Sequence, residues 1–168
     1  MLKLALFRKF SLHSPMTAKL LSQSDLNTVI RLAPLVSIDL IIRDTADRVL
    51  LGLRNNEPAK GYFFVPGGIV LKDEPLAEAF ARIIHKEISY SATLRQAKLV
   101  GVFDHFYETN RSGEPGYGTR YIALAHEVRL QDTSGILPDS QHSEYGWWSV
   151  PDILKSNRVH ENTKAYFR

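Results

Sequence analysis

The segment from Tyr62 to Glu87 constrains the fold more than any other part of the sequence. It begins with the apolar and aromatic run 62–65, typical of a strand. A Pro-Gly-Gly turn follows, and then alanine, leucine and charged residues that favour a helix. Asp73 is a candidate N-cap, and Pro75 suits the first turn, where a missing N–H costs little. The segment therefore predicts a strand, a tight turn and a helix in direct succession.

The helix expected after this turn is amphipathic, with one acid on its apolar face. At about 100° per residue one stripe collects the apolar side chains, which are Leu76, Phe80, Ile83 and Ile84. Glu74, Glu78 and Arg82 fall on the opposite face, where Glu78 and Arg82 are spaced to form an ion pair. Glu87 falls within the apolar stripe instead. An acid directed at a buried face must be paired, protonated or bound to a metal, so Glu87 is a candidate functional residue.

Composition indicates one globular domain and excludes several functions. The chain has 168 residues, of which 44% are hydrophobic and 23% charged, with a net charge of +3. That charge is too small for a dedicated nucleic-acid-binding protein but suits an anionic ligand. Cysteine is absent, so any metal must be bound by oxygen or imidazole. No apolar run is long enough to cross a bilayer, and we expect a cytoplasmic protein with neither a membrane nor a nucleic-acid partner.

Residues 1–15 differ from the rest because they carry basic side chains and no acid. Their apolar stretch is too short for a secretory signal. Two interpretations remain open, an amphipathic basic targeting peptide and a disordered basic leader with Met16 as an alternative start. Residues 16–168 are expected to form a single domain.

Periodicity predicts strands on both sides of the central helix. The alternating or apolar runs lie at 35–43, 49–54, 62–65, 98–107, 119–130 and 145–149. Shorter helices are expected at 22–30, at 150–156 and in the tail 159–167, which would pack Tyr166 and Phe167 against the body. The glycine-rich segment 108–118 is expected to be a flexible loop. This order of elements indicates an α+β or mixed α/β sandwich.

The central segment resembles the Nudix signature, Gly-x5-Glu-x7-Arg-Glu-hydrophobic-x-Glu-Glu-x-Gly-hydrophobic. The matching positions are Gly68, Glu74, Arg82 and Glu87. The departures are Ile83 and Lys86 in place of glutamates and Ser89 in place of glycine. The resemblance gives Gly68, Glu74 and Arg82 structural roles, with Arg82 fixing a carboxylate. Ordinary Nudix pyrophosphatases use the two missing glutamates to bind several Mg²⁺ ions, whereas the GDP-mannose mannosyl hydrolase branch lacks both and works with one ion.

Much of the chain from Leu20 to Phe167 is similar to that branch. The similarity is carried by APLVSIDLII, LLGLRNNEPAKGYFFVPGG, KDEPLAEAFAR, GVFDHFYE, LPDSQHSEY and VHENTKAYF. It implies a Nudix-type α/β/α sandwich with a mixed central sheet, a homodimer, and one Mg²⁺ or Mn²⁺ ion per subunit. The implied reaction is hydrolysis of GDP-mannose or GDP-glucose to GDP and free hexose, in which water attacks C1 of the sugar.

The same resemblance assigns the metal ligands and the principal catalytic groups. Glu87, Gln141 and the backbone carbonyl of Gly67 match the ligands, an oxygen set that suits Mg²⁺. His142 matches the general base, which an imidazole can supply near neutral pH. Arg54 matches an arginine that binds the diphosphate and stabilises its departure.

Further matches border the substrate. His105 and Tyr121 correspond to hydrogen-bond donors to the leaving group or sugar, and Asp39 corresponds to an acid near the active site. His105 shares a predicted strand face with two aromatic residues, so a core histidine is an equal alternative. The amino-terminal segment that borders the nucleotide corresponds to Leu20, Leu21 and Leu26.

Ile69 is the departure that bears most on activity, because the branch has a second phosphate-facing arginine there. Losing a charge-assisted hydrogen bond to phosphate costs about 1.5–3 kcal/mol. Lys72 and Lys86 are candidates to replace the charge. Two other functions therefore stay open, a Nudix pyrophosphatase that attacks phosphorus of a nucleoside diphosphate derivative and a catalytically weak pseudoenzyme that binds nucleotide sugars.

Overall fold

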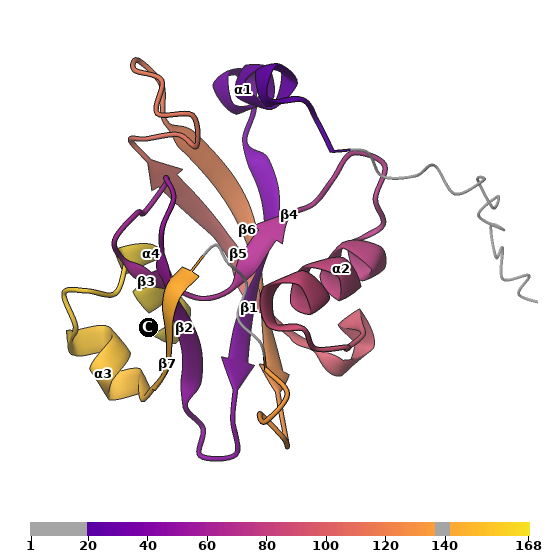
Figure 1. Ribbon diagram of the computed structural model, residues 1–168, viewed down its shortest axis with the longest axis vertical. Helices are drawn as coiled ribbons and strands as arrows, with labels where there is room; N and C mark the ends of the chain where they lie inside the picture. Colours follow the sequence, from indigo (N-terminus) through magenta and orange to yellow (C-terminus); the bar gives the residue numbers. More distant parts are fainter. Residues whose placement is uncertain (1–19, 137–141) are drawn as a thin grey trace, which may run out of the picture.

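The computed structural model describes residues 20–136 and 142–168, with the backbone alone at 142 and 143. The expectations for residues 1–15 and for Gln141 lie outside this range. In the described residues a mixed sheet of seven strands forms the centre of the molecule (Figure 1). The strands are β1 (Leu35–Arg43), β2 (Val49–Arg54), β3 (Phe63–Phe64), β4 (Gly67–Ile69), β5 (Lys98–Tyr107), β6 (Thr119–Arg129) and β7 (His142–Trp148).

Strand β1 is the central strand of this sheet. The order is β3-β2-β1-β6-β5, with β4 paired to β1 and β7 paired to β2. β1 runs parallel to β6 and antiparallel to both β2 and β4. The mixed sheet expected from the sequence is therefore confirmed. Gly67 and Gly68, expected in a tight turn, instead belong to strand β4, because their backbones pair with Asp39 and Ile38 of β1.

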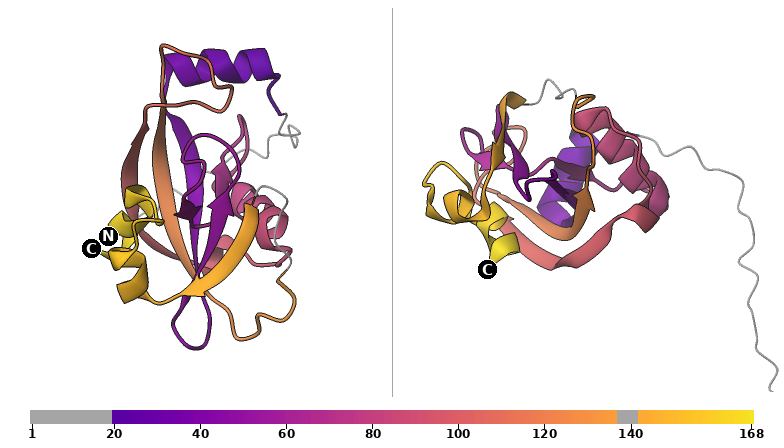
Figure 2. Two further views of the ribbon diagram at one scale, coloured as in Figure 1. Left: turned by 60° about the vertical axis from the view of Figure 1, so that its left-hand side comes forward. Right: turned by 90° about the horizontal axis from the view of Figure 1, so that it is seen from below.

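Helices cover both faces of the sheet. They are α1 (Gln23–Leu32), α2 (Leu76–Ile88), α3 (Val150–Lys155) and α4 (Glu161–Lys164), with 3₁₀ turns η1 (Leu94–Gln96) and η2 (Ala165–Phe167). α2 packs on one face, α3 and α4 lie on the other, and α1 sits across one end (Figures 1 and 2). One core joins α2 to β1, and a second joins β2 and β3 to α3 and the tail, where Tyr166 is buried as expected. No helix in the described part of the chain is long and apolar enough to cross a membrane.

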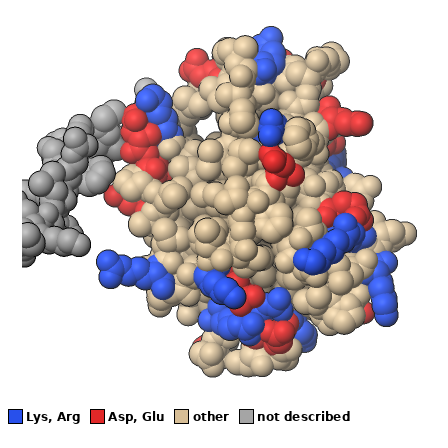
Figure 3. All heavy atoms as spheres, turned by 180° about the vertical axis from the view of Figure 1, so that it is seen from behind, with Lys and Arg blue, Asp and Glu red and all other residues tan. Residues whose placement is uncertain are grey.

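The strands expected at 35–43, 49–54 and 98–107 are confirmed at those residues. β7 begins three residues before its expected start, because it continues pairing with β2 as far as the Arg54–His142 pair. On the face opposite to the view of Figure 1, basic and acidic side chains are interspersed (Figure 3). This mixture of signs matches the small net charge of +3.

Helix α2 differs from its expected form at its first turn. Asp73 is not the N-cap, because it lies outside the helix with φ 62°, and Pro75 takes the cap position. Leu76, expected in the apolar stripe, is 45% exposed. The rest of the stripe is confirmed, since Phe80, Ile83, Ile84 and Glu87 are buried.

Candidate active site

The predicted site residues converge on one pocket between α1, α2 and the sheet. Those that line it are Leu20, Leu26, Asp39, Arg54, Gly67, Gly68, Arg82, Glu87, His105 and Tyr121. Leu21 does not line the pocket and is 43% exposed. Gln141 falls outside the described residues, and of His142 the structure shows only that its backbone pairs with Arg54. Segments far apart in sequence are thus brought to one place.

The glycine pair allows β4 to pack closely against β1 and α2. Gly67 pairs with Asp39, and a Cβ at Gly67 would lie 2.8 Å from the carbonyl oxygen of Ile38 and 2.9 Å from Asp39 Oδ1. A Cβ at Gly68 would lie 3.2 Å from Ile83 Cγ1. Both approaches are tighter than ordinary contacts, so this segment requires residues without side chains.

Arg82 has the structural role expected of it. Its Nε and Nη2 atoms donate to the two carboxylate oxygens of Glu74 at 2.6 and 2.7 Å, and Nη2 also donates to the carbonyl oxygen of Ile69 at 2.9 Å. These bonds hold the pKa of Glu74 below its usual range. The Glu74 side chain is only 3% exposed, so its expected place on the solvated face is wrong, and Arg82 pairs with it rather than with Glu78. The bridge fixes the turn to the helix.

Glu87 is a buried acid in the wall of the pocket. It is 2% exposed and lines the pocket together with Gly67. The neighbouring positions that would supply further acids hold Ile83, which is buried, and Lys86. Within the described residues no group of three or more His, Asp or Glu side chains could hold a metal. A carboxylate and a backbone carbonyl that line the same pocket are hard oxygen donors, the type that divalent cations such as Mg²⁺ prefer.

A buried hydrogen-bond chain joins Asp39, Tyr166 and His105. The Tyr166 hydroxyl donates to Asp39 Oδ2 at 2.5 Å and lies 3.2 Å from His105 Nε2. Burial raises the pKa of Asp39 and lowers the pKa of His105 to about 4, so His105 is neutral at physiological pH. His105 is 3% exposed, as expected of a core histidine, and it also lines the pocket.

Tyr166 belongs to this site although the sequence assigned it only to packing. It comes from η2, on the opposite side of the sheet from α2. The one feature of the sequence that pointed to Tyr166 is its position within VHENTKAYF, one of the stretches that resemble the mannosyl hydrolase branch. Periodicity alone could not show that its hydroxyl reaches Asp39, 127 residues away in the chain.

Arg54 is the donor in the pocket that most clearly lacks a partner. Its guanidinium lies 5.8 Å from the centre of the Phe64 ring, and its buried Nε has no hydrogen-bond partner among the described residues. Burial raises the pKa of Tyr121, and the positive charge of Arg54 acts in the opposite direction. A buried unpaired donor on a cation is costly unless a ligand accepts from it, which indicates an anion-binding position.

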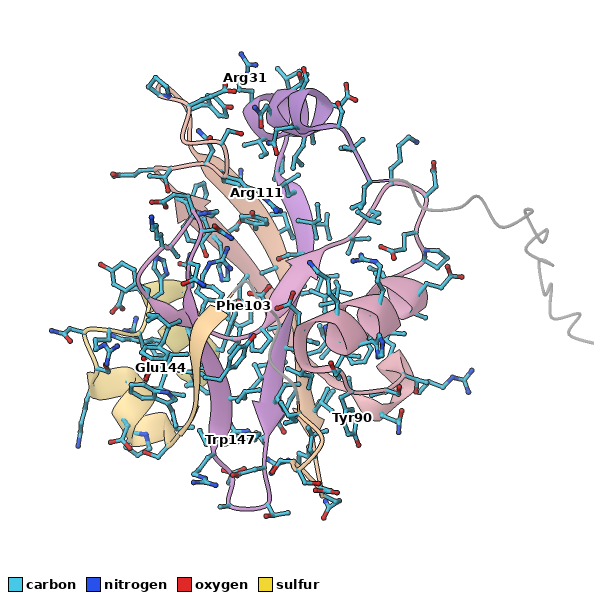
Figure 4. The ribbon with its side chains drawn as sticks, viewed as in Figure 1. Arg31, Tyr90, Phe103, Arg111, Glu144 and Trp147 are labelled. Atoms are coloured by element: carbon cyan, nitrogen blue, oxygen red, sulfur yellow. The ribbon has the colours of Figure 1, made fainter. Side chains whose placement is uncertain are left out.

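The basic residues of the pocket differ from those expected. Lys72 does not line it and instead pairs with Asp73 at 3.3 Å on the surface, so it cannot replace the charge missing at Ile69. Lys86 does line the pocket. Arg111, which the sequence did not single out, also lines it from the loop between β5 and β6 (Figure 4). That loop was expected to be flexible, so nothing in the sequence pattern placed Arg111 near the pocket.

A sheet with this topology, a Gly-Gly strand β4 bonded through Arg82 to an amphipathic helix, and a buried Glu87 define a class of metal-dependent hydrolases. The model of the NUDIX domain matches residues 33–168, and the chain therefore belongs to the NUDIX family. NUDIX hydrolases generally depend on a divalent metal ion.

Sequence and structure comparisons agree with this assignment. The low-salt glycan biosynthesis protein Agl8 of Haloferax volcanii is 43% identical over 119 residues, which cover 70% of this chain and 72% of Agl8. The MutT protein of Methanosarcina mazei Go1 is 22% identical with a TM-score of 0.65, covering 80% of this chain and 91% of MutT. The NUDIX domain of Shewanella oneidensis NrtR, complexed with ADP ribose, is 16% identical with a TM-score of 0.60, covering 88% and 97%. These two structures share the fold.

Proposed function

We propose that this chain hydrolyses a GDP-hexose, GDP-mannose or GDP-glucose, to GDP and free hexose by attack of water at C1 of the sugar. The observation that carries the proposal is the acid content of α2. Of the three signature glutamates that follow or adjoin Arg82, only Glu87 is present, and Ile83 and Lys86 occupy the other two positions in the pocket wall. Chemistry that needs several metal ions at phosphorus lacks its ligands here, whereas attack at carbon needs only one ion on the diphosphate.

The relative from Haloferax volcanii gives independent support. Its name places Agl8 in glycan biosynthesis, a process that consumes activated sugars. A nucleotide sugar is therefore a reasonable substrate class for this chain. The preference for guanine rests on the resemblance of the sequence to the mannosyl hydrolase branch.

In this proposal Glu87, the Gly67 carbonyl and Gln141 would hold one Mg²⁺ or Mn²⁺ ion, which would supply positive charge to neutralise the diphosphate. Arg54 offers its unpaired guanidinium to the same phosphates and stabilises GDP as it departs. His142 takes a proton from the attacking water; its backbone pairs with that of Arg54, so the two belong to the same edge of the site.

The remaining residues orient the substrate. The hydrogen-bond chain of Asp39, Tyr166 and His105 holds a neutral imidazole at the pocket wall, where it can exchange a hydrogen bond with a sugar hydroxyl or leaving-group oxygen. The Tyr121 hydroxyl stays protonated because burial raises its pKa, and it is available as a donor. Leu20 and Leu26 give an apolar wall for the nucleoside.

The decisive experiment follows the oxygen of the attacking water. The protein is incubated with GDP-mannose and Mg²⁺ in ¹⁸O-labelled water, and the products are analysed by mass. We expect label in mannose and none in GDP. Label in GMP or mannose 1-phosphate would establish the pyrophosphatase instead, and tight binding without turnover would establish the pseudoenzyme.

Two variants test the assigned roles. Glu87→Gln should lose most of its Mn²⁺ affinity, measured by electron paramagnetic resonance, whereas Glu78→Gln on the exposed side of the same helix should not. His142→Gln should lower kcat about 10²–10⁴-fold, the usual contribution of a general base. A His142→Gln enzyme with near-normal kcat would remove His142 from the mechanism.

A homodimer and a cytoplasmic location complete the proposal. Strand β5 is at the end of the sheet order, and its outer face exposes Leu99, Val102 and Phe106 at 53%, 59% and 66%. An edge strand with a row of exposed apolar side chains suits a two-fold contact with a second copy. Light scattering should show a dimer that Phe106→Glu converts to a monomer, while Leu32→Glu, on the exposed side of α1, leaves it intact.

A further inference from the structure

Two arginines in the pocket have no acidic partner. Arg82 is bonded to both oxygens of Glu74, but neither Arg54 nor Arg111 forms an ion pair within residues 20–136 and 142–168. Arg54 comes from the end of β2 and Arg111 from the β5–β6 loop, so they reach the pocket from separate elements. Unpaired guanidinium groups that line a pocket are typical of sites for phosphate or carboxylate ligands.

The loop that carries Arg111 has a defined shape rather than the flexible one expected from its glycines. Asn110, which is 1% exposed, donates through Nδ2 to the carbonyl oxygens of Glu114 and Tyr117 at 2.7 and 2.9 Å. Its Oδ1 accepts from the backbone N–H groups of Ser112 and Glu114 at 3.1 and 3.2 Å. These bonds surround the residue directly before Arg111, so the direction of the Arg111 backbone is fixed.

Helix α1 locks this loop in place over the pocket. Asn27 is 7% exposed, accepts a hydrogen bond from Ser112 Oγ at 2.5 Å, and donates from Nδ2 to Glu114 Oε1 at 2.7 Å. Gln23 supports Asn27 with a further hydrogen bond at 2.8 Å. The same helix contributes Leu26 to the pocket wall. α1 and the loop therefore form one unit, and Arg111 projects from it toward the sheet (Figure 4).

The strand register shows where this charge acts. Tyr121, which lines the pocket together with Arg111, pairs with Leu35 of β1. Ile69 pairs with Ser37, two residues further along β1. Arg111 thus adds positive charge to the pocket that Ile69 also lines, where the sequence lacks the expected arginine.

We propose that Arg111 is a second anion-binding residue of this pocket, which acts with Arg54 on the phosphates of the substrate and replaces the charge missing at Ile69. Asn27 is its positioning residue, because it holds the loop but does not itself line the pocket. This inference rests on the proposed function for the identity of the substrate. It does not depend on the sugar or on the site of water attack.

The test measures binding of Mg²⁺-pyrophosphate by calorimetry and hydrolysis of GDP-mannose by steady-state kinetics. Loss of one charge-assisted contact predicts that Arg111→Ala raises the Kd for pyrophosphate and the KM about tenfold to a hundredfold. Arg111→Lys should recover part of the loss. Arg95→Ala is the matched control, since Arg95 is exposed on η1 and lies outside the pocket. Guanosine binding should not change.

A double-mutant cycle tests the positioning role. Asn27→Ala should weaken pyrophosphate binding several-fold in the native background and add nothing in the Arg111→Ala background, because its effect passes through Arg111. Circular dichroism and thermal unfolding confirm that each variant is folded. Independent losses in the two backgrounds would overturn the positioning role.

The outcomes separate this inference from the proposed function. Weaker pyrophosphate binding in Arg111→Ala, in a protein that does not hydrolyse GDP-mannose at carbon, would refute the function and support the role of Arg111. Hydrolysis at carbon, with the Kd and KM unchanged in Arg111→Ala, would support the proposed function and refute the role of Arg111. An equal loss in Arg95→Ala, an equal loss for guanosine, or no pyrophosphate binding by the native chain would overturn the inference.

Discussion

The bridge between Glu74 and Arg82 makes a sharp prediction about stability. Glu74→Gln removes the negative charge but keeps the shape of the side chain. In the native chain one carboxylate oxygen accepts from Arg82 Nε, and the other accepts from Arg82 Nη2 and from the backbone N–H of Leu71 at 2.9 Å. A glutamine has one acceptor oxygen, and its NH₂ group would face a donor. The variant loses a charge-assisted hydrogen bond at a nearly buried side chain, and its NH₂ group faces another donor. We therefore expect the free energy of unfolding to fall by about 2–3 kcal/mol.

The assay is urea unfolding followed by tryptophan fluorescence, with Glu78→Gln as the control. Glu78 lies in the first turn of α2 and is exposed, so its variant should stay within about 0.5 kcal/mol of the native chain. This pair of variants also distinguishes the observed Glu74–Arg82 bridge from the Glu78–Arg82 pair suggested by helical spacing. A loss in Glu78→Gln equal to that in Glu74→Gln would refute the assignment.

The pH dependence of the difference in unfolding free energy between the native chain and Glu74→Gln gives a second check. The pKa of Glu74 is lowered in the folded state, mainly by the hydrogen bonds from Arg82. The bridge therefore contributes its full stability above the unfolded-state pKa of a glutamate, about 4.3, and loses it as pH falls through the folded pKa. The difference in unfolding free energy between the native chain and Glu74→Gln should be constant near neutrality and shrink in acid. A difference that grew in acid would contradict the role of the carboxylate.

Three further substitutions test other parts of the site. Gly67→Ala should destabilise the chain by at least about 1 kcal/mol and lower activity, since the added Cβ meets the β1 backbone at 2.8 Å; unchanged urea unfolding and kcat would contradict this. Tyr166→Phe should cost about 1–3 kcal/mol, because buried Asp39 loses a donor, whereas Tyr62→Phe, at a 43% exposed side chain, should be neutral by thermal unfolding. Ser89→Gly should stabilise by up to about 1 kcal/mol, because Ser89 has φ 55° at the end of α2; a lower Tm would refute it.

Local pattern predicted most of the elements but not their termini, and it missed strand β4, which occupies residues expected to form a tight turn. The strand at 35–43 and the buried side of α2 follow from periodicity, which depends on nearby residues only. The predicted N-cap of α2 was wrong for two reasons. The Glu74 carboxylate accepts hydrogen bonds from Arg82 and from the backbone N–H of Leu71, and Asp73 has a positive φ outside the helix. Such competition between partners depends on the tertiary fold, which spacing along the chain does not reveal.

The sequence predicted site residues only where they match the motifs of a known family. Gly67, Glu87 and Arg54 were placed by resemblance, and the structure brings them to one pocket. Arg111 and Tyr166 carry no such mark. Arg111 is placed by a loop whose shape comes from one buried asparagine, and Tyr166 by packing on the far side of the sheet. Both depend on contacts between distant segments, which local sequence cannot specify.

The hydrogen bond between Tyr166 and Asp39 also affects how the protein is made. Asp39 leaves the ribosome 127 residues before the side chain that binds it. Until Tyr166 has been synthesised, the Asp39 carboxylate in the central strand lacks its closest donor and keeps only the longer hydrogen bond from Ser37 Oγ at 3.2 Å. Chains released early would therefore retain most of the sheet sequence yet present an incomplete core to the quality-control machinery. One hydroxyl group thus makes completion of the buried hydrogen-bond chain a late event in the synthesis of the molecule.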